Sequence, residues 1–550
     1  MNTLPKASIE VWGGMECTIN RVHDEYFDQL HHSGHYYREG DIDLFAGLGL
    51  KKMRYPILWE HHQPDKYRTI NWSGTESKLK ALRAKNIGVI AGLVHHGSGP
   101  AFVNMMKDSF AEGLAKYAAQ VAERFPWIEY YTPVNEPLTT ARFCGLYGLW
   151  APHGKSDNSF CRILINECKA TVLAMAAIRV FNPVAKLVQT DDLAKIHSSP
   201  VLNYQAEFEN ERRWLSFDLL CGRVDNNHTL WHYLTDNGIA RSELEFFMDN
   251  PCPPDILGIN YYLTSERYLD ECKENYPSHT HGTNGRDSYA DVEAVRVGKV
   301  RPDGVQQLLT TAWDRYNIPI AITEIHLHCT REEQMRWLNE AWLAANDLKN
   351  NGIPVVAITP WALLGSFGWD QLLTRSYGTY EPGVFDISDG YPRPTILAAM
   401  ISAYSRYETF QHAALDCPGW WKRSCRVAYG EDDFFLPVMP SGPVLAISGT
   451  RSADLSHICR KRCLHAVETD ESNLMDEHIL ATININEYMV VSCKGCADLV
   501  ICLTQGDLNH CINAGLDFFL DGESGYWEMA SNGRLTKQFP DVSPEQQLAS

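Results

Sequence analysis

Two glutamates stand directly after short apolar runs, each in an unusual local sequence. Glu136 follows Thr132–Asn135, and Glu324 follows Ile322–Thr323. Cleavage of a glycosidic bond needs two such carboxyl groups with different pKa values: one protonates the departing oxygen, and the other attacks the anomeric carbon or activates water. Either glutamate alone is equally typical of a solvated loop start. Their occurrence together, after the fourth and the seventh apolar run, favours a catalytic pair.

The elements that must position this pair are strands and helices in strict alternation. Eight apolar runs fit buried parallel strands: Ile9–Glu16, Lys52–Leu58, Gly88–His95, Ile128–Asn135, Lys186–Thr190, Ile256–Tyr262, Ile318–Glu324 and Val355–Trp361. Amphipathic stretches such as Phe110–Arg124, Cys161–Phe181 and Glu332–Lys349 fall between them. Eight strand-then-helix units predict an α/β fold of the (β/α)8 barrel type; a doubly wound open sheet is the alternative.

Polar and aromatic side chains gather where these runs end. They are Glu16, Arg54, His95, Asn135, Glu136, Asn260, Tyr261, Tyr262, Glu324 and Trp361. The carboxyl ends of barrel strands form one face, which carries the active site in barrel enzymes. The pattern therefore predicts a single site built from many strands.

Residues 9–405 resemble the family-one glycoside hydrolases. Thr132–Pro137 is similar to the T-x-N-E-P motif of the family, Ile322–Glu324 to I-T-E-N-G, and Gly145–Gly154 to G-Y-x-x-G-x-x-A-P-G. Ile256–Tyr262 matches the sixth strand, and Trp361–Leu364 resembles the W-S-L-L run of the eighth. The resemblance implies a retaining β-glycosidase of the β-glucosidase type that works by double displacement and needs no cofactor or metal.

The resemblance also implies roles for single residues. Glu136 would be the acid/base and Glu324 the nucleophile, with Tyr262 donating to Glu324 and Arg54 keeping it ionised. The implied substrate contacts are Asn20, Arg54, His95, His96, Asn135, Asn260, Tyr262, Trp361 and Trp369. Alternative readings remain for three of these: a structural ion pair for Arg54, a core histidine for His95, and packing alone for Trp361.

Several positions depart from the family pattern at the sugar-binding shell. Gly368, in Ser366–Trp369, replaces the glutamate of N-F-E-W, and His96 replaces the tryptophan of H-W. Asn20 is shorter than the usual glutamine. Lost recognition of this kind would leave sugar hydroxyls unpaired, and Glu16, His96 or Asp370 are candidates for a replacement contact. The alternatives to hydrolysis are a carbohydrate-binding or sensing protein on the same barrel, and a transglycosylase.

The chain changes character after the predicted barrel of residues 1–407. Residues 408–442 are expected to form a linker and 443–550 a small Rossmann-like domain. Ser448–Ala453 carries one glycine where a dinucleotide turn needs several. Leu516–Trp527 resembles the late part of dTDP-4-dehydrorhamnose reductases. We expect a shortened remnant that binds no cofactor; a working reductase is the alternative.

The cysteines of this region pose a separate question. Cys459 and Cys463, with Cys493 and Cys496, have spacings that approach a four-thiolate zinc site. Small buried thiols are the favoured interpretation, and no metal is predicted.

Composition excludes some partners. The formal net charge of −19 argues against nucleic acid and anionic membranes. The N-terminal residues show no secretory signal, no run is long enough to span a membrane, and the sixteen cysteines are typical of reduced cytosolic thiols. A cytoplasmic protein acting on a small-molecule glycoside is expected, with a homo-oligomer left open.

Overall fold

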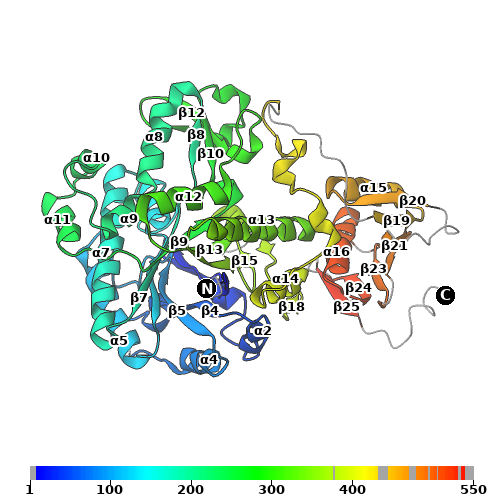
Figure 1. The fold of residues 1–550 in the computed structure, drawn as a ribbon, viewed down its shortest axis with the longest axis horizontal. Coiled ribbons are helices and arrows are strands. Elements are labelled where there is room, and N and C mark those ends of the chain that lie inside the picture. The colour runs from blue at the N-terminus through cyan, green and yellow to red at the C-terminus, as the bar shows by residue number, and fades with distance from the viewer. Residues whose placement is uncertain are drawn as a thin grey trace, which may run out of the picture.

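The computed structural model describes residues 8–67, 69–375, 378–431, 444–469, 479–493, 496–504, 506–530 and 534–538. Its larger part is a closed barrel in which all eight strands run parallel, and its smaller part is a separate sheet with two helices (Figure 1). The predicted fold class is therefore confirmed. None of the helices among these residues combines the length and the apolar character needed to cross a bilayer.

Each of the eight predicted runs overlaps one barrel strand, and their ends agree to within two residues. In barrel order they are β1 (Glu10–Gly14), β4 (Lys52–Pro56), β5 (Gly88–His95), β6 (Tyr130–Asn135), β7 (Lys186–Asp192), β9 (Ile256–Tyr261), β13 (Ile320–Ile325) and β14 (Val355–Pro360). β1 closes the barrel by pairing with both β4 and β14. Strands covered on both faces have no solvated side, and this explains why the runs are apolar throughout.

Helices surround the barrel and bury one face each. The main ones are α4 (Ser73–Ala84), α5 (Asp108–Arg124), α7 (Asp157–Phe181), α11 (Arg241–Asp249), α12 (Gly304–Tyr316), α13 (Arg331–Asn350) and α14 (Ile396–Ser405). In α5, Phe110, Leu114, Tyr117 and Val121 recur at helical spacing and are fully buried. The predicted helical stretches coincide with α5, α7 and α13.

A second, four-stranded sheet stands at the carboxyl ends of the barrel strands. It is formed by β8 (Ile196–Ser198), β10 (Arg267–Asp270), β11 (His281–Thr283) and β12 (Ser288–Glu293), which lie together at the top of Figure 1. These strands come from the loops after β7 and β9. The sequence did not predict this sheet.

Residues 408–431 cover the barrel rather than leaving it. Three single-turn 3-10 helices, Ala413–Asp416, Trp420–Lys422 and Ser424–Arg426, form this segment. Trp421 is buried and its ring meets that of Trp337 of α13 edge to face, with the centroids 5.1 Å apart. The rest of the expected linker, residues 432–442, lies outside the described residues.

The C-terminal region forms a seven-stranded mixed sheet. Its order is β20 (His465–Glu468), β19 (Val444–Ser448), β21 (Ile479–Ile485), β22 (Tyr488–Ser492), β23 (Leu499–Cys502), β24 (Gly525–Met529) and β25 (Leu535–Gln538). The helices α15 (Ser452–Lys461) and α16 (Leu508–Leu520) pack on it around Leu455, Ile512 and Leu516. The strand–turn–helix of β19 and α15 has the Rossmann-like connection expected from the sequence.

This sheet docks on the barrel through buried charges. The guanidinium of Arg462, just after α15, binds both carboxylate oxygens of Glu332 in α13, at 3.0 and 2.5 Å. Asp521, at the end of α16, forms ion pairs with Arg331 and Arg393, each at 3.0 Å, and accepts the backbone N–H of Ile396 at 2.8 Å. In Figure 1, α16 lies beside the ends of α13 and α14.

Candidate active site

The side chain of Glu324 projects from near the end of β13 and is held by two donors. Arg54, from β4, donates from Nη1 to Oε1 at 2.8 Å. Tyr262, directly after β9, donates its hydroxyl to Oε2 at 2.5 Å. Glu324 is only 2% exposed, so these two contacts fix its carboxylate in a dry environment. Both partners were named from the sequence.

Glu136 stands at the end of β6, at the start of the short helix α6 (Pro137–Ala141). Its backbone adopts the left-handed conformation with φ 47°, which a non-glycine residue rarely takes and which carries strain of about 1–3 kcal/mol. Asn260 donates from Nδ2 to Oε1 at 2.5 Å. Nε2 of His96 lies 3.7 Å from Oε2. Glu136 is therefore buried, strained and oriented.

The surroundings of the two carboxyls act on their pKa values with different strength. Burial raises the pKa of Glu324 to about 7, against the opposing effects of the Arg54 charge and the Tyr262 hydrogen bond. Burial, and then the negative charge of Glu324, raise the pKa of Glu136 well above its ordinary value. When one proton is shared, it therefore resides on Glu136. This is the division of roles that acid catalysis beside a nucleophile requires.

Asn135 links the two carboxyl groups through a hydrogen-bonded network. Its Oδ1 accepts from Nη2 of Arg54 at 2.6 Å and from the hydroxyl of Thr190 at 2.7 Å. Its Nδ2 faces Nε2 of His95 at 3.3 Å. The carbonyl-type oxygen is thus occupied, and the amide nitrogen is directed toward the histidine pair. Thr190 was not singled out from the sequence.

Aromatic rings line the same space. The ring of His95 is stacked on Trp361, with centroids 5.5 Å apart and planes 7° from parallel, and the Arg54 guanidinium lies 4.8 Å from the Trp361 ring centre. The ring of Trp369 approaches His96 edge to face at 5.7 Å. The structure therefore brings these predicted side chains together around the carboxyls.

Glu16 lies inside this aromatic group. Its Oε1 accepts from the backbone N–H of Thr18 at 3.0 Å, and its Oε2 accepts from Nε1 of Trp361 at 3.1 Å. Burial raises its pKa. Asp370, the other carboxylate considered for a replacement contact, binds the backbone and hydroxyl of Thr379 instead. It braces its own loop.

The turn after Gly368 approaches the site in a way that the sequence did not reveal. Asn20 donates from Nδ2 to the carbonyl of Leu373 at 3.0 Å, and Trp150 donates from Nε1 to the carbonyl of Leu372 at 2.8 Å. Gly368, Leu372 and Leu373 all have positive φ. The turn thus occupies the amide donor of Asn20, which was expected to contact the substrate. The positive φ of Gly368 would strain any other residue there.

Two further contacts, one directly after β13 and one between the segments that follow β4 and β5, were not predicted. His326 lies 3.0 Å from Glu381, and Glu60 accepts the backbone N–H of Gly99 at 2.9 Å, next to the loop after His96. Burial raises the pKa of Glu60 to about 7. A buried acid directly after the second strand run is a signal that the sequence did contain.

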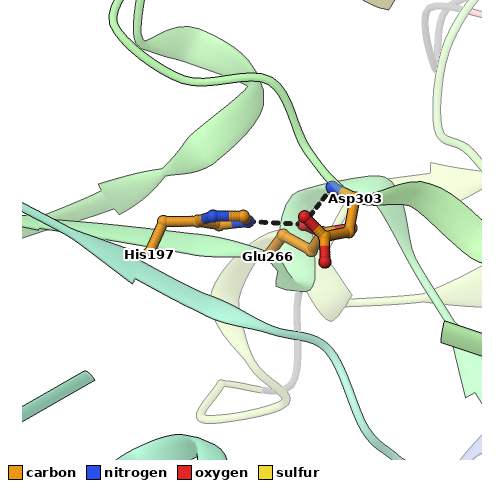
Figure 2. A group of neighbouring side chains, drawn as sticks. All are labelled: His197, Glu266 and Asp303. Carbon is orange, nitrogen blue, oxygen red and sulfur yellow. Dashed lines mark hydrogen bonds and ion pairs between the residues drawn. The ribbon is translucent and has the colours of Figure 1, made fainter. Parts of the chain in front are cut away.

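One cluster has the residue types of a metal site, but its central carboxylate is already satisfied by donors from the protein. Figure 2 shows His197, Glu266 and Asp303 together. Glu266 accepts from His197 and the backbone of Asp303 at one oxygen, and from Tyr261 and the backbone of Gly304 at the other. Four donors satisfy the lone pairs of one carboxylate. The cluster therefore holds the loop before α12 together.

The C-terminal cysteines and the β19 turn were the other two places where the sequence raised the question of a bound metal or cofactor. Among the described residues, no group of three or more potential ligands includes Cys459, Cys463, Cys493 or Cys496. Asn486 accepts from both the backbone and the hydroxyl of Thr450. The turn that would approach a pyrophosphate in a dinucleotide site is thus bonded to its own sheet.

Comparison with known proteins gives consistent matches. The model of "Glycosyl hydrolase family 1" matches residues 16–382. "Beta-glucosidase A" of Thermotoga maritima is 21% identical over 62% of this chain and 80% of its own length; "Aryl-phospho-beta-D-glucosidase BglH" of Bacillus subtilis is 23% identical over 60% and 76%. Among solved structures, a family 1 β-glucosidase from T. maritima superposes with a TM-score of 0.59 at 16% identity, covering 74% of this chain and 98% of that one. The structural likeness shows the shared fold.

Proposed function

Since the chain belongs to glycosyl hydrolase family 1, we propose that it is a retaining β-glycosidase of the β-glucosidase type that uses Glu324 as nucleophile and Glu136 as acid/base. One observation carries the assignment. Two buried carboxyls from β6 and β13 share one site, and only Glu324 has an arginine and a tyrosine hydroxyl as partners. That asymmetry favours ionised Glu324 beside protonated Glu136.

The proposed reaction has two steps. Ionised Glu324 attacks the anomeric carbon while Glu136 gives its proton to the departing oxygen, and a glycosyl ester forms on Glu324. Glu136, now a carboxylate, takes a proton from water, which attacks the anomeric carbon and releases Glu324. In this reaction the amide of Asn135 donates a hydrogen bond to the sugar hydroxyl next to the anomeric centre. A transglycosylase would share the ester and differ only in the acceptor of the second step.

The ester provides the decisive test. A 2-deoxy-2-fluoro β-glycoside with a good leaving group forms such an ester quickly and loses it slowly. Intact mass spectrometry should show one added glycosyl unit, and peptide mapping should place it on Glu324. Glu324→Gln should show no label and no turnover of nitrophenyl β-glycosides. A label on another residue, or full activity in Glu324→Gln, would contradict the assignment.

The acid/base role needs its own comparison. Glu136→Gln should cut turnover strongly for alkyl glycosides, whose leaving group must be protonated. It should cut ester formation far less for a dinitrophenyl glycoside, whose leaving group departs as a stable anion. Equal losses for the two substrates would exclude Glu136 as the acid. Thr140 lies in α6, which begins directly after Glu136, and contacts His96. Thr140→Val is therefore a matched control, and its effect should be the same for both substrates.

A second candidate is a carbohydrate-binding protein without turnover. The observation in its favour is the turn 368–373, whose carbonyls hold Asn20 and Trp150 and reduce the donors available to a sugar. The fluoro-glycoside experiment separates the two functions. Binding by calorimetry with no covalent label from gluco-, galacto- or xylo-configured reagents would favour this candidate.

For the remaining regions we infer the following. The C-terminal sheet is a shortened relative of dTDP-4-dehydrorhamnose reductases that serves as a structural domain, supported by the Asn486 contacts in its β19 turn. The expected domain limits are 1–407, 408–442 and 443–550. The protein is cytoplasmic, as its reduced cysteines favour, and calorimetry with a nicotinamide nucleotide should show no binding.

A further inference from the structure

A cavity of about 700 Å³ lies outside the barrel, between α12, α13 and residues 415–426. This volume is in the range of small-molecule sites. Helix α13 contributes one face to it, with Arg336, Glu340, Leu343 and Asp347 at helical spacing. The cavity is separate from the catalytic carboxyls, which project into the barrel mouth.

Arg336 gives this cavity an unused cationic donor. The side chain is 4% exposed. Its Nε donates to the carbonyl of Ala414 at 2.7 Å, and its Nη1 donates to Glu333 at 2.9 Å. Its Nη2 has no partner among the described residues. Buried polar groups are nearly always paired, so two unpaired N–H bonds on a buried guanidinium indicate a missing acceptor.

A second donor and a helix end border the same cavity. Nε1 of Trp337 is also buried without a partner within the described part of the chain. Helix α12 starts here without a side-chain cap, and the N–H groups of its first turn have no acceptor inside the helix. That of Gly304 binds Glu266, and the next two, on Val305 and Gln306, belong to the cavity wall. A helix N-terminus favours anions.

The acidic side chains of the cavity wall already have partners, so the groups left to bind a ligand are hydrogen-bond donors. Asp303 binds Lys195 at 2.8 Å, Glu340 binds Lys422 at 2.8 Å, and Asp347 accepts from Gln306. Apolar surface completes the wall, from Leu263, Pro302, Leu343, Ala344, Leu415 and Trp421. The ligand that fits has several acceptor oxygens with negative charge and a small organic body.

We propose that this cavity binds a small organic phosphate. Five donors, two on Arg336, one on Trp337 and two in the first turn of α12, exceed what a carboxylate accepts and suit the three terminal oxygens of a phosphate ester. The phosphate lies toward Arg336, and the organic part lies against Leu343 and Trp421. The site is independent of the glycosidase assignment.

Calorimetry on the full-length protein tests the site, with glycerol 3-phosphate as the probe and glycerol at the same concentration as the blank. Saturable binding of one equivalent is expected for the phosphate only. Leu343→Trp, at a largely exposed position of the wall, adds bulk where the organic part is proposed to lie and should weaken binding. Arg336→Gln should weaken binding by about tenfold or more, and Arg241→Gln, an exposed arginine on α11, should leave it unchanged.

Two results would overturn the proposal. One is no saturable binding of glycerol 3-phosphate to the wild-type chain. The other is unchanged affinity in Leu343→Trp, because the phosphate would then lie elsewhere, including in the barrel mouth. Should Arg336→Gln fail to fold, the Leu343→Trp result alone decides, since that variant leaves every contact of Arg336 in place. An unchanged midpoint of thermal unfolding in Leu343→Trp excludes general damage.

Discussion

The hydrogen bond from Tyr262 to Glu324 makes a measurable prediction for the pH dependence of catalysis. Burial raises the pKa of Glu324 to about 7, and this hydroxyl, at 2.5 Å from Oε2, is one of the two contacts that lower it. Tyr262→Phe removes the donor and leaves the ring. The ionised form of Glu324 loses a partner that the protonated form needs less, so its pKa must rise further.

The size of the shift follows from the strength of the bond. A hydrogen bond to a charged group contributes about 1.5–3 kcal/mol, and one pKa unit corresponds to about 1.4 kcal/mol. The pKa of Glu324 should therefore rise by about 1–2 units. Because the reaction needs ionised Glu324, activity falls as the pH drops through this pKa. The acid limb should move from near pH 7 to about pH 8–9.

The assay is the pH profile of kcat/KM for a nitrophenyl β-glycoside, since this ratio reports the pKa values of the free enzyme. Tyr261→Phe is the matched control. It removes a neighbouring buried hydroxyl that binds Glu266, and its acid limb should stay in place. A Tyr262→Phe enzyme that is slower at every pH, with an unmoved acid limb, would refute the reasoning.

Two further predictions concern stability. Burial raises the pKa of Glu60 to about 7, so Glu60 should contribute about 3 kcal/mol of stability at low pH that is lost as the pH rises from about 4.5 through 7. Glu60→Gln should make the loss of stability between pH 5 and pH 8, measured by urea melts, smaller by about this amount, and an unchanged loss would contradict the prediction. Glu332→Met leaves Arg462 buried without its main partner and should lower the free energy of unfolding by about 3–5 kcal/mol. The double variant Glu332→Met with Arg462→Met should recover much of this loss. A double variant as unstable as the single one would count against a buried pair.

The barrel was predictable because its strands are buried on both faces and so appear as unbroken apolar runs. Their ends were less certain. β1 stops at Gly14, two residues before the end of its predicted run, and β7 continues to Asp192, two residues beyond. The small sheet of β8, β10, β11 and β12 was not predicted. β8 and β11 have only three residues each, and β11 is exposed throughout, so these two strands carry no periodic signal. β12 does alternate between more exposed and buried residues, and that pattern was missed.

The candidate site likewise contains contacts that the sequence predicts and contacts that it does not. Arg54, Tyr262 and Glu324 meet because the closed barrel brings the carboxyl ends of β4, β9 and β13 to one face. This follows from the topology that the strand–helix pattern predicts. The contact of Asn20 with Leu373 depends instead on a turn in which two leucines adopt positive φ. Leucine gives no sign of that conformation in a sequence. Contacts made by irregular backbone could therefore not be predicted.

The charged start of α13 shows how a second domain changes the meaning of a pattern. Arg331, Glu332 and Glu333 would be read as the solvated first turn of a surface helix, yet all three are buried. Arg331 pairs with Asp521 and Glu332 with Arg462, both more than a hundred residues later. Local sequence contains no information about such distant partners.

The buried ion pairs that dock the C-terminal sheet fix its orientation more than they stabilise its attachment. Buried ion pairs lose in desolvation much of what they gain in attraction, and their clearest effect is to make one arrangement preferable to others. Asp521 forms an ion pair with Arg331 and accepts hydrogen bonds from Arg393 and the backbone of Ile396. Groups from the start of α13 and from residues 393–396 thus converge on one carboxylate, which favours a single orientation. Arg331 opens α13, seven residues after Glu324. The C-terminal sheet is thus held in a fixed orientation beside the loop that follows the proposed nucleophile, which makes that loop the part of the catalytic face most dependent on the domain.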